Sequence, residues 1–396
     1  MKMLGVRSLL CFLMLFSTWA FAQINLDSIL QSSTLLNKVY NNKNKYRLQV
    51  VYTHVEKKDQ ANAYPTYSFN TGDYVYCASL IKLPIAVLAL YKLNELGIHE
   101  DAILFTDSSE FCHHKMWRDT SSKSGYPSIA HYIKKMLLVS DNESFNRCFE
   151  FLGADYIHYQ LAKWGFPEVR IVNRYELPCA NGKNLFTNPV RLLDQNLKVL
   201  YEQGPQPIHE KWRKPLQTVL IGKGYLDQNN RYIKGAKDFS FMNFMRLEDV
   251  HRFLLELLYT RADKFNLNQN QYDFLLRYMS MAPAEAGFPR YDAKTYPANY
   301  KKYLYYGDKA ESVNDSTFVS INIVGLSYGF ISDCAGFKDP STGIEFVLSA
   351  SLYVNENEII NDGKYEYKQL GLPFLAELGK KIIEYEKKAK GINRKE

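Results

Sequence analysis

Apolar residues cover nearly every side of a helix drawn over residues 80–96, which predicts a buried central helix that ends at Gly97. Shorter segments repeat apolar residues at the spacing of an amphipathic helix. They lie at residues 129–138, 143–151, 156–164, 189–201, 247–259 and 271–278, with a closing helix at 372–388. These segments predict a largely helical middle of the chain.

Strand patterns flank this helical middle, marked by β-branched and aromatic residues. They lie at residues 46–55, 66–70, 318–325, 330–338 and 345–354. Strands at both ends with helices between them indicate one sheet built from the two termini. The segment from about 204 to 316 is rich in Asn, Lys and Tyr, and we interpret it as helices plus insertions that could shape a cleft.

The first residues have the pattern of a secretory signal peptide. Lys2 and Arg7 precede an apolar run over residues 9–16, and Ala20-Phe21-Ala22 fits a small-residue cleavage site. The run is too short to cross a bilayer. We therefore predict a signal peptide over 1–22, cleavage after Ala22, and an exported protein, periplasmic or secreted, with residues 23–396 forming a single domain.

The charge balance is mildly basic and argues against nucleic acid as a partner. The formal net charge of +7 falls to about +5 once Lys2 and Arg7 are removed, and the excess is spread along the chain. No segment after the signal peptide is long and apolar enough to span a membrane. We expect a monomer without stable membrane insertion that acts on a small-molecule substrate.

Cysteine usage suggests no metal site. Of the six cysteines, Cys11 lies in the signal peptide, and the odd number that remains leaves at least one thiol unpaired. Cys112-His113-His114 is a weak metal candidate, because adjacent residues on a loop rarely point at one ion. No metal or organic cofactor is implied.

The residues that indicate chemistry are Ser79-Leu80-Ile81-Lys82 and Ser140-Asp141-Asn142. A serine and a lysine three apart on a helix lie on one face, so the amine can serve the hydroxyl as a base. The second triplet supplies another hydroxyl and an amide. Either triplet alone could simply cap a helix, but together they predict a serine acyl-enzyme.

With a third element, the chain resembles class A β-lactamases and their relatives in the serine β-lactamase and penicillin-binding protein superfamily. The matching segments are residues 78–85, Leu138 to Asn142 with Asn146, Arg174-x-Glu176, and Thr187-Asn188-Pro189, which resembles the start of the next helix in the family. The resemblance implies an α/β (α+β) fold of the β-lactamase/transpeptidase type. In that fold an antiparallel sheet of about five strands from both termini packs with helices, beside an all-helical lobe.

The resemblance also implies roles. Ser79 would be the nucleophile, Lys82 the base or proton relay, and Ser140 the donor of a proton to the leaving nitrogen. Asn142 would bind the acyl amide, and the backbone N–H groups of Ser79 and Leu326 would hold the oxyanion.

Glu176 would position the water that hydrolyses the acyl-enzyme. Arg174 is expected to pair with carboxylates of its own loop, and Asn181 or Asn184 could also hold the water.

One motif departs from the family. Its third motif is Lys-Thr-Gly or Lys-Ser-Gly on an inner strand, where this chain has Ile323-Val324-Gly325. In the family this lysine helps to bind the substrate carboxylate, so the usual anchor is missing. The nearby Gly325-Leu326-Ser327-Tyr328-Gly329 matches the nucleophile elbow of α/β-hydrolases, but a strand rather than a helix is predicted after it and no histidine follows. We interpret it as a turn between strands.

Three functions remain open. The first is a β-lactamase-type hydrolase that opens a β-lactam or a related cyclic or peptidic amide. The second is a DD-peptidase, penicillin-binding or sensor-like protein whose acyl-enzyme on peptidoglycan peptides persists. The third is a catalytically silent cell-wall-binding module, suggested by Ile323 and the 30 tyrosines.

Overall fold

The protein is seen here as a computed structural model that describes residues 24–55, 64–108, 113–177, 185–259, 262–307 and 318–392. The predicted signal peptide lies outside these residues. In the described part of the chain, none of the helices combines the length and apolar character needed to cross a membrane.

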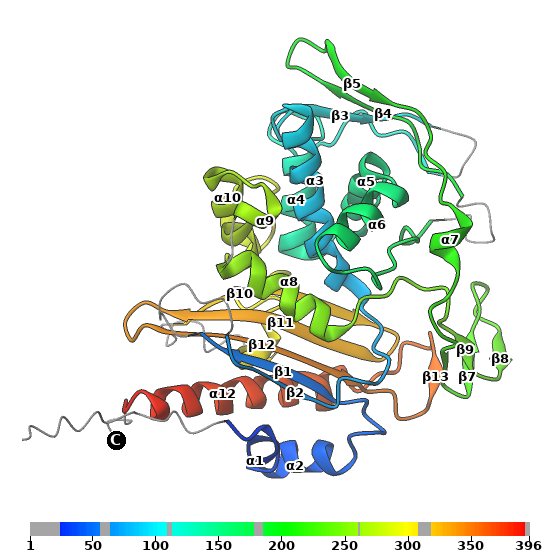
Figure 1. Cartoon of the computed structure of the whole chain (residues 1–396). Helices are drawn as coiled ribbons and strands as arrows, with labels where there is room; N and C mark the ends of the chain where they lie inside the picture. Colours follow the sequence, from blue (N-terminus) through cyan, green and yellow to red (C-terminus); the bar gives the residue numbers. More distant parts are fainter. Residues whose placement is uncertain are drawn as a thin grey trace, which may run out of the picture.

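An antiparallel five-stranded sheet unites the two ends of the chain, as predicted (Figure 1). Its order is β10 (Val319–Ser327), β11 (Phe330–Asp339), β12 (Ile344–Tyr353), β1 (Gln49–His54) and β2 (Thr66–Phe69). Tyr328 and Gly329 join β10 to β11 with φ of 53° and 85°, the backbone of a type I′ hairpin turn. Ser327 therefore ends a strand of a hairpin, which confirms the interpretation of this motif as a turn.

Helices cover both faces of the sheet (Figure 1). On one face, α12 (Leu372–Ala389) packs with α1 (Leu26–Leu30) and α2 (Thr34–Asn41) over an apolar cluster that includes Val50, Leu348 and Leu378. On the other face lie α8 (Leu247–Tyr259) and the helical region.

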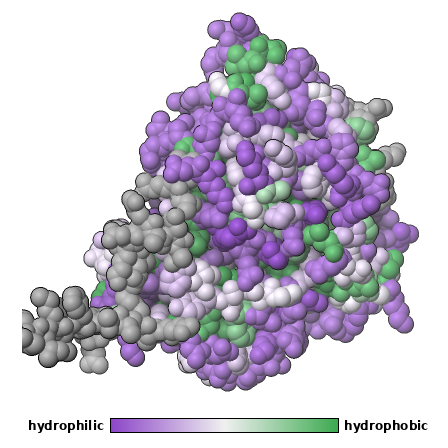
Figure 2. Space-filling view, viewed as in Figure 1, coloured by the Kyte–Doolittle hydropathy of each residue, from purple (hydrophilic) through white to green (hydrophobic). Residues whose placement is uncertain are grey.

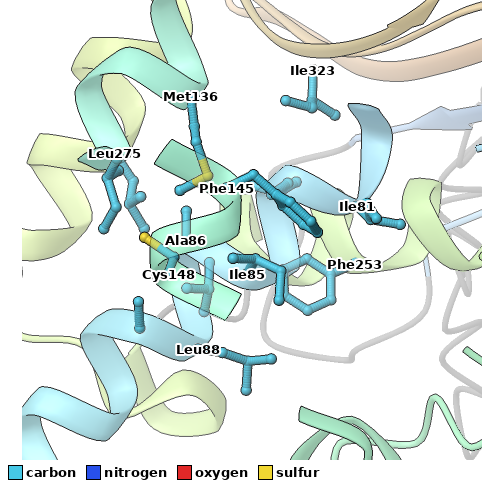
Figure 3. Close-up of a cluster of buried hydrophobic side chains, with 14 of the residues drawn as sticks. Ile81, Ile85, Ala86, Leu88, Met136, Phe145, Cys148, Phe253, Leu275 and Ile323 are labelled. Carbon is cyan, nitrogen blue, oxygen red and sulfur yellow. The ribbon is translucent and has the colours of Figure 1, made fainter. Parts of the chain in front are cut away.

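The helical region is built around α3 (Lys82–Leu96), whose side chains are buried on nearly all sides. Its neighbours are α4 (Ile129–Val139), α5 (Asn142–Leu152), α6 (Ala154–Lys163), α9 (Ala262–Phe265) and α10 (Gln269–Ser280). Gly97 ends α3 at φ 64°, the left-handed conformation that its position in the sequence predicts. Figure 3 shows the core between α3, α4 and α5, where Ile85, Met136 and Phe145 meet.

The prediction of a helix over residues 189–201 is wrong. The structure has a hairpin of β4 (Val190–Leu193) and β5 (Val199–Gln203), paired with β3 (Ile103–Thr106). Asp194 causes the reversal, because its carboxylate accepts hydrogen bonds from the N–H groups of residues 196 and 198, with φ 64° at Leu197. Short apolar runs do not distinguish strands from helices, and here local turn chemistry decides.

Thr187-Asn188-Pro189, which resembles a helix start of the family, begins no helix here, because a strand follows it. The Asn188 amide donates to the carbonyls of Asp107 and His113, at 2.9 and 2.6 Å, and the chain then enters β4. The hairpin tip exposes Leu197, Val199 and Leu200, the apolar patch at the top of Figure 2.

The segment from 204 to 316 holds more strands than predicted. Its described elements are α7 (Glu210–Arg213), β6 (Leu220–Ile221), β7 (Gly224–Leu226), β8 (Tyr232–Lys234), β9 (Lys237–Asp238), α8, α9, α10 and α11 (Tyr303–Tyr306). β7 pairs with β8 and with β13 (Ile359–Ile360), and β6 pairs with β9. Short paired strands, which the spacing of apolar residues does not reveal, form most of the first part of this segment.

Candidate active site

Ser79 lies on a tight turn between the sheet and the central helix. The turn, Ala78–Ile81, is 3₁₀-helical and leads directly into α3. Ala78 has φ of 44°, a strained conformation for a residue with a side chain. Strain of this kind is common where a structure fixes one side chain for function, and here it precedes the half-buried Ser79.

The end strand β10 comes up against this turn at Gly325. A Cβ atom at Gly325 would lie 2.7 Å from the Cys77 carbonyl oxygen, so only glycine allows the approach. The next residue, Leu326, is 41% exposed on β10, which is the end strand of the sheet in the described part of the chain. This places Gly325 and Leu326 beside the Ser79 turn, where the sequence predicted them.

Lys82 is fully buried at the start of α3, and its amine meets the Ser140 triplet. Nζ lies 3.1 Å from Ser140 Oγ and 2.6 Å from Asn142 Oδ1, and it also contacts the Ser140 carbonyl. The ring of Tyr175 packs 5.6 Å from Nζ. Burial lowers the pKa of Lys82 to about 7, although the negative charges of Asp141 and then Glu176 oppose the change. An amine with this pKa can accept a proton near neutral pH.

The Ser140 triplet joins two helices. Ser140 ends α4 at φ 60°, and the Asp141 carboxylate caps α5 by accepting from the Ser144 N–H at 2.7 Å. The capping expected of such a triplet is therefore real, but Asp141 provides it. Ser140 and Asn142 remain available to meet Lys82.

Glu176 lies on a loop that is clamped beside the Ser79 turn. The Asn146 amide exchanges two hydrogen bonds of 2.8 Å with the backbone of Tyr175, and the Tyr175 hydroxyl donates to the Ala78 carbonyl at 2.6 Å. Asn243 accepts from the N–H groups of residues 172 and 173, both at 2.8 Å. Glu176 itself is exposed, with φ of 53°, and is close enough to Lys82 to affect the pKa of its amine.

Arg174 was expected to pair with carboxylates of its own loop. Among the described residues it instead forms an ion pair with Glu150 on α5. Glu150 is completely buried and contacts the guanidinium groups of Arg174 and Arg147 and, at 2.5 Å, Nδ1 of His113. Arg174 also donates to the Phe186 carbonyl at 2.9 Å. The cluster fixes the start of the Glu176 loop to α5.

The same cluster determines the pKa and the hydrogen-bond partners of His113, which belongs to the weak metal candidate Cys112-His113-His114. Burial alone would lower its pKa, but the carboxylates of Glu143 and Glu150 outweigh burial and raise it. Both ring nitrogens already face these carboxylates, at 3.0 and 2.5 Å, which leaves neither for a metal ion. Cys112 lies outside the described residues.

Ile323 belongs to the core. It is 2% exposed, and Figure 3 shows it among the apolar side chains that include Met136 and Phe145. The position at which the resemblance leads one to expect a lysine therefore holds a buried apolar side chain. The free thiols of Cys77, Cys148 and Cys334 are buried too, in agreement with the predicted unpaired cysteine, and burial raises the pKa of each. Asn181, Asn184 and Cys179 lie outside the described residues.

One buried amine near the site was not found from the sequence. Lys301 is 9% exposed, and its Nζ donates to the Leu137 carbonyl at 3.0 Å, three residues before Ser140. Its charge also interacts with that of Lys82. Lys301 follows no motif, and only the fold brings it here.

Comparisons with known proteins identify the family and the fold. A family model described as the β-lactamase enzyme family matches residues 31–291. The curated proteins contain no match. Among solved structures, a variant of the TLA-1 extended-spectrum β-lactamase is 16% identical, with a TM-score of 0.53 over 91% of this chain and 98% of that one.

Two further structures extend the likeness. A variant of PBP-A in an acyl-enzyme complex with penicillin G is 13% identical, with a TM-score of 0.51 over 91% of this chain and 97% of that one. A β-lactamase from Sphaerobacter thermophilus is 11% identical, with a TM-score of 0.51 over 93% of this chain and 98% of that one. At these identities the structures show the fold, while the family model covers Ser79, Lys82, Ser140 and Glu176. The chain belongs to the β-lactamase enzyme family and is a hydrolase of the β-lactamase and penicillin-binding protein type.

Proposed function

We propose that this protein is an exported serine hydrolase of the class A β-lactamase type, which opens a β-lactam or a related cyclic or peptidic amide through an acyl-enzyme on Ser79. The observation that carries the proposal is the buried amine of Lys82, held between Ser140 and Asn142 at the start of the helix that follows Ser79. A desolvated amine in this place can take the Ser79 proton as the hydroxyl attacks the carbonyl.

Each of the other groups in the site would take part in one of the remaining steps. The backbone N–H groups of Ser79 and Leu326 would hold the oxyanion, and the Asn142 amide would bind the acyl side of the substrate. The proton on Lys82 would pass through Ser140 Oγ, 3.1 Å away, to the leaving nitrogen. Glu176 would then activate the water that frees the acyl group.

A second candidate is a DD-peptidase, penicillin-binding or sensor-like protein. It is favoured by the exposure of Glu176, since a solvated carboxylate that fails to direct water leaves the acyl-enzyme intact. The two candidates share Ser79, Lys82 and Ser140 and differ in the lifetime of the acyl-enzyme.

Intact mass spectrometry of the Glu176→Ala protein after exposure to penicillin G tests the proposal. We expect the mass of one added penicillin, because acylation proceeds while hydrolysis is blocked. Wild type should return to its free mass between turnovers, and Ser79→Ala should gain no mass.

A stable adduct on wild type as well would favour the second candidate. If neither wild type nor Glu176→Ala forms an adduct, the remaining explanations are a cell-wall-binding module or a hydrolase with a different acyl substrate. Turnover that survives Ser79→Ala would exclude every serine-based function.

The pH dependence of acylation gives an independent prediction. Because the neutral amine of Lys82 is the base, the acylation rate constant should rise with pH and reach half its maximum near pH 7. The charge of Glu176 raises the pKa of Lys82, so Glu176→Gln should move this midpoint to lower pH. Stopped-flow measurement of acylation from about pH 5 to about pH 9 checks both statements. A midpoint that moves to higher pH in Glu176→Gln would contradict them.

A further inference from the structure

A segment that carries two lysines runs along the free edge of β10. Lys302 Nζ donates to the Ser320 carbonyl at 3.0 Å and to Asn322 Oδ1 at 2.6 Å, and the Asn322 amide donates to the Lys301 carbonyl at 2.6 Å. β10 is an end strand of the sheet, so these contacts seal part of its open edge. They hold Lys301 beside the strand that carries Ile323 and Gly325.

From this edge the Lys301 side chain reaches the opposite side of the site. Its Nζ donates at 3.0 Å to the Leu137 carbonyl in the last turn of α4, which ends at Ser140. The amine thus connects the β10 edge to the helix end that presents Ser140. Lys82 is close enough for its positive charge to act on Lys301.

The charges of the two neighbouring lysines are balanced differently. The charge of Asp333 partly opposes the effect of burial on the pKa of Lys302. The Asp333 carboxylate accepts hydrogen bonds from the Asn322 amide at 2.8 Å and the Leu304 N–H at 2.9 Å. For Lys301, burial and then the charges of Lys82 and Lys302 lower the pKa well below its usual value, and Asp333 only partly opposes them. Among the described residues, the surroundings of Lys301 therefore favour its neutral amine, and an incoming anion would favour the ammonium.

We propose that Lys301 binds the carboxylate of the substrate beside Ser140, the role that the resemblance would give to a lysine at the position of Ile323. Ser140 serves the leaving nitrogen, so the anion recognised here is a carboxylate on the leaving-group side of the scissile amide. The assignment rests on the proposed function. Lys301 lies outside residues 31–291, the part of the chain that matches the family model.

Two boronic acids test the assignment without turnover. Phenylboronic acid and 3-carboxyphenylboronic acid both add to a serine oxygen through boron, but only the second carries a carboxylate. We expect wild type to bind the carboxylated compound more tightly, and Lys301→Gln to lose about 10- to 100-fold of that affinity while it still binds phenylboronic acid. Lys301→Arg should keep part of the preference, since the charge remains.

The matched control is Lys92→Gln. Lys92 is also a buried lysine, 7% exposed, and its amine donates to the Phe151 carbonyl at 2.5 Å and Gln203 Oε1 at 2.8 Å on the far part of α3. Its replacement removes the same group from the protein interior without touching the site, so the preference for the carboxylated compound should survive.

The outcomes separate the two proposals. A preference unchanged in Lys301→Gln would overturn the role of Lys301 and leave the serine chemistry standing. Boronate binding that is absent from wild type, or unaffected by Ser79→Ala, would refute the proposed function first. If Lys301→Gln does not bind even phenylboronic acid, the Lys301→Arg variant decides the question. The assignment is overturned if Lys301→Arg binds phenylboronic acid but shows no preference for the carboxylated compound.

Discussion

Replacing Lys82 with methionine is expected to slow acylation of Ser79 by penicillin G about 10²- to 10⁴-fold, the usual contribution of a positioned general base. Methionine keeps the length and apolar stem of the side chain, so the core around α3 should stay packed. What is lost is the amine that contacts Ser140 and Asn142. The rate constant can be followed by mass spectrometry in the Glu176→Ala background, where the adduct persists.

Lys92→Met is the control for this change. Lys92 lies on the same helix, and burial also lowers the pKa of its amine to about 7, but its partners are Phe151 and Gln203. The low pKa alone therefore cannot make it a base for Ser79, and acylation should be nearly unaffected. Equal losses in the two variants would mean that buried amines support the fold of α3, and Lys82 would not be the base.

The sequence predicts the part of the site that depends on local spacing. Ser79 and Lys82 lie one helical turn apart, so a helix alone brings them to one face. Strand patterns at the two ends of the chain also predict one sheet built from both termini, which the structure has. The first inference uses the spacing of residues within one helical turn, and the second uses the residue pattern of whole strands.

Contacts between distant segments could not be predicted in this way. Arg174 pairs with Glu150, 24 residues earlier, and nothing in the local pattern distinguishes this carboxylate from those of the loop. Lys301 reaches Leu137 across 164 residues, because the segment before α11 pairs with the β10 edge. The hairpin at 190–203 was missed because the turn at Asp194 overrides an apolar pattern that suits either helix or strand.

Glu150→Ala is expected to lower the free energy of unfolding by about 3–5 kcal/mol, the usual cost of removing one partner from a buried ion pair. Glu150 is 0% exposed and is shared by His113, Arg147 and Arg174. Alanine would remove this carboxylate from two buried guanidinium groups, of which that of Arg147 also contacts Glu143. Urea unfolding followed by circular dichroism measures the change.

Glu356→Ala provides the comparison. Glu356 pairs with Lys45 at 2.5 Å, but these side chains are 41% and 54% exposed, and exposed pairs contribute about 0–1 kcal/mol. Glu150 also fixes the start of the Glu176 loop through Arg174, so the milder Glu150→Gln should lengthen the lifetime of the acyl-enzyme in protein that is still folded. If Glu150→Ala were no more destabilising than Glu356→Ala, the cluster would add little to stability, and the position of Glu176 would depend on the contacts of Asn146, Tyr175 and Asn243.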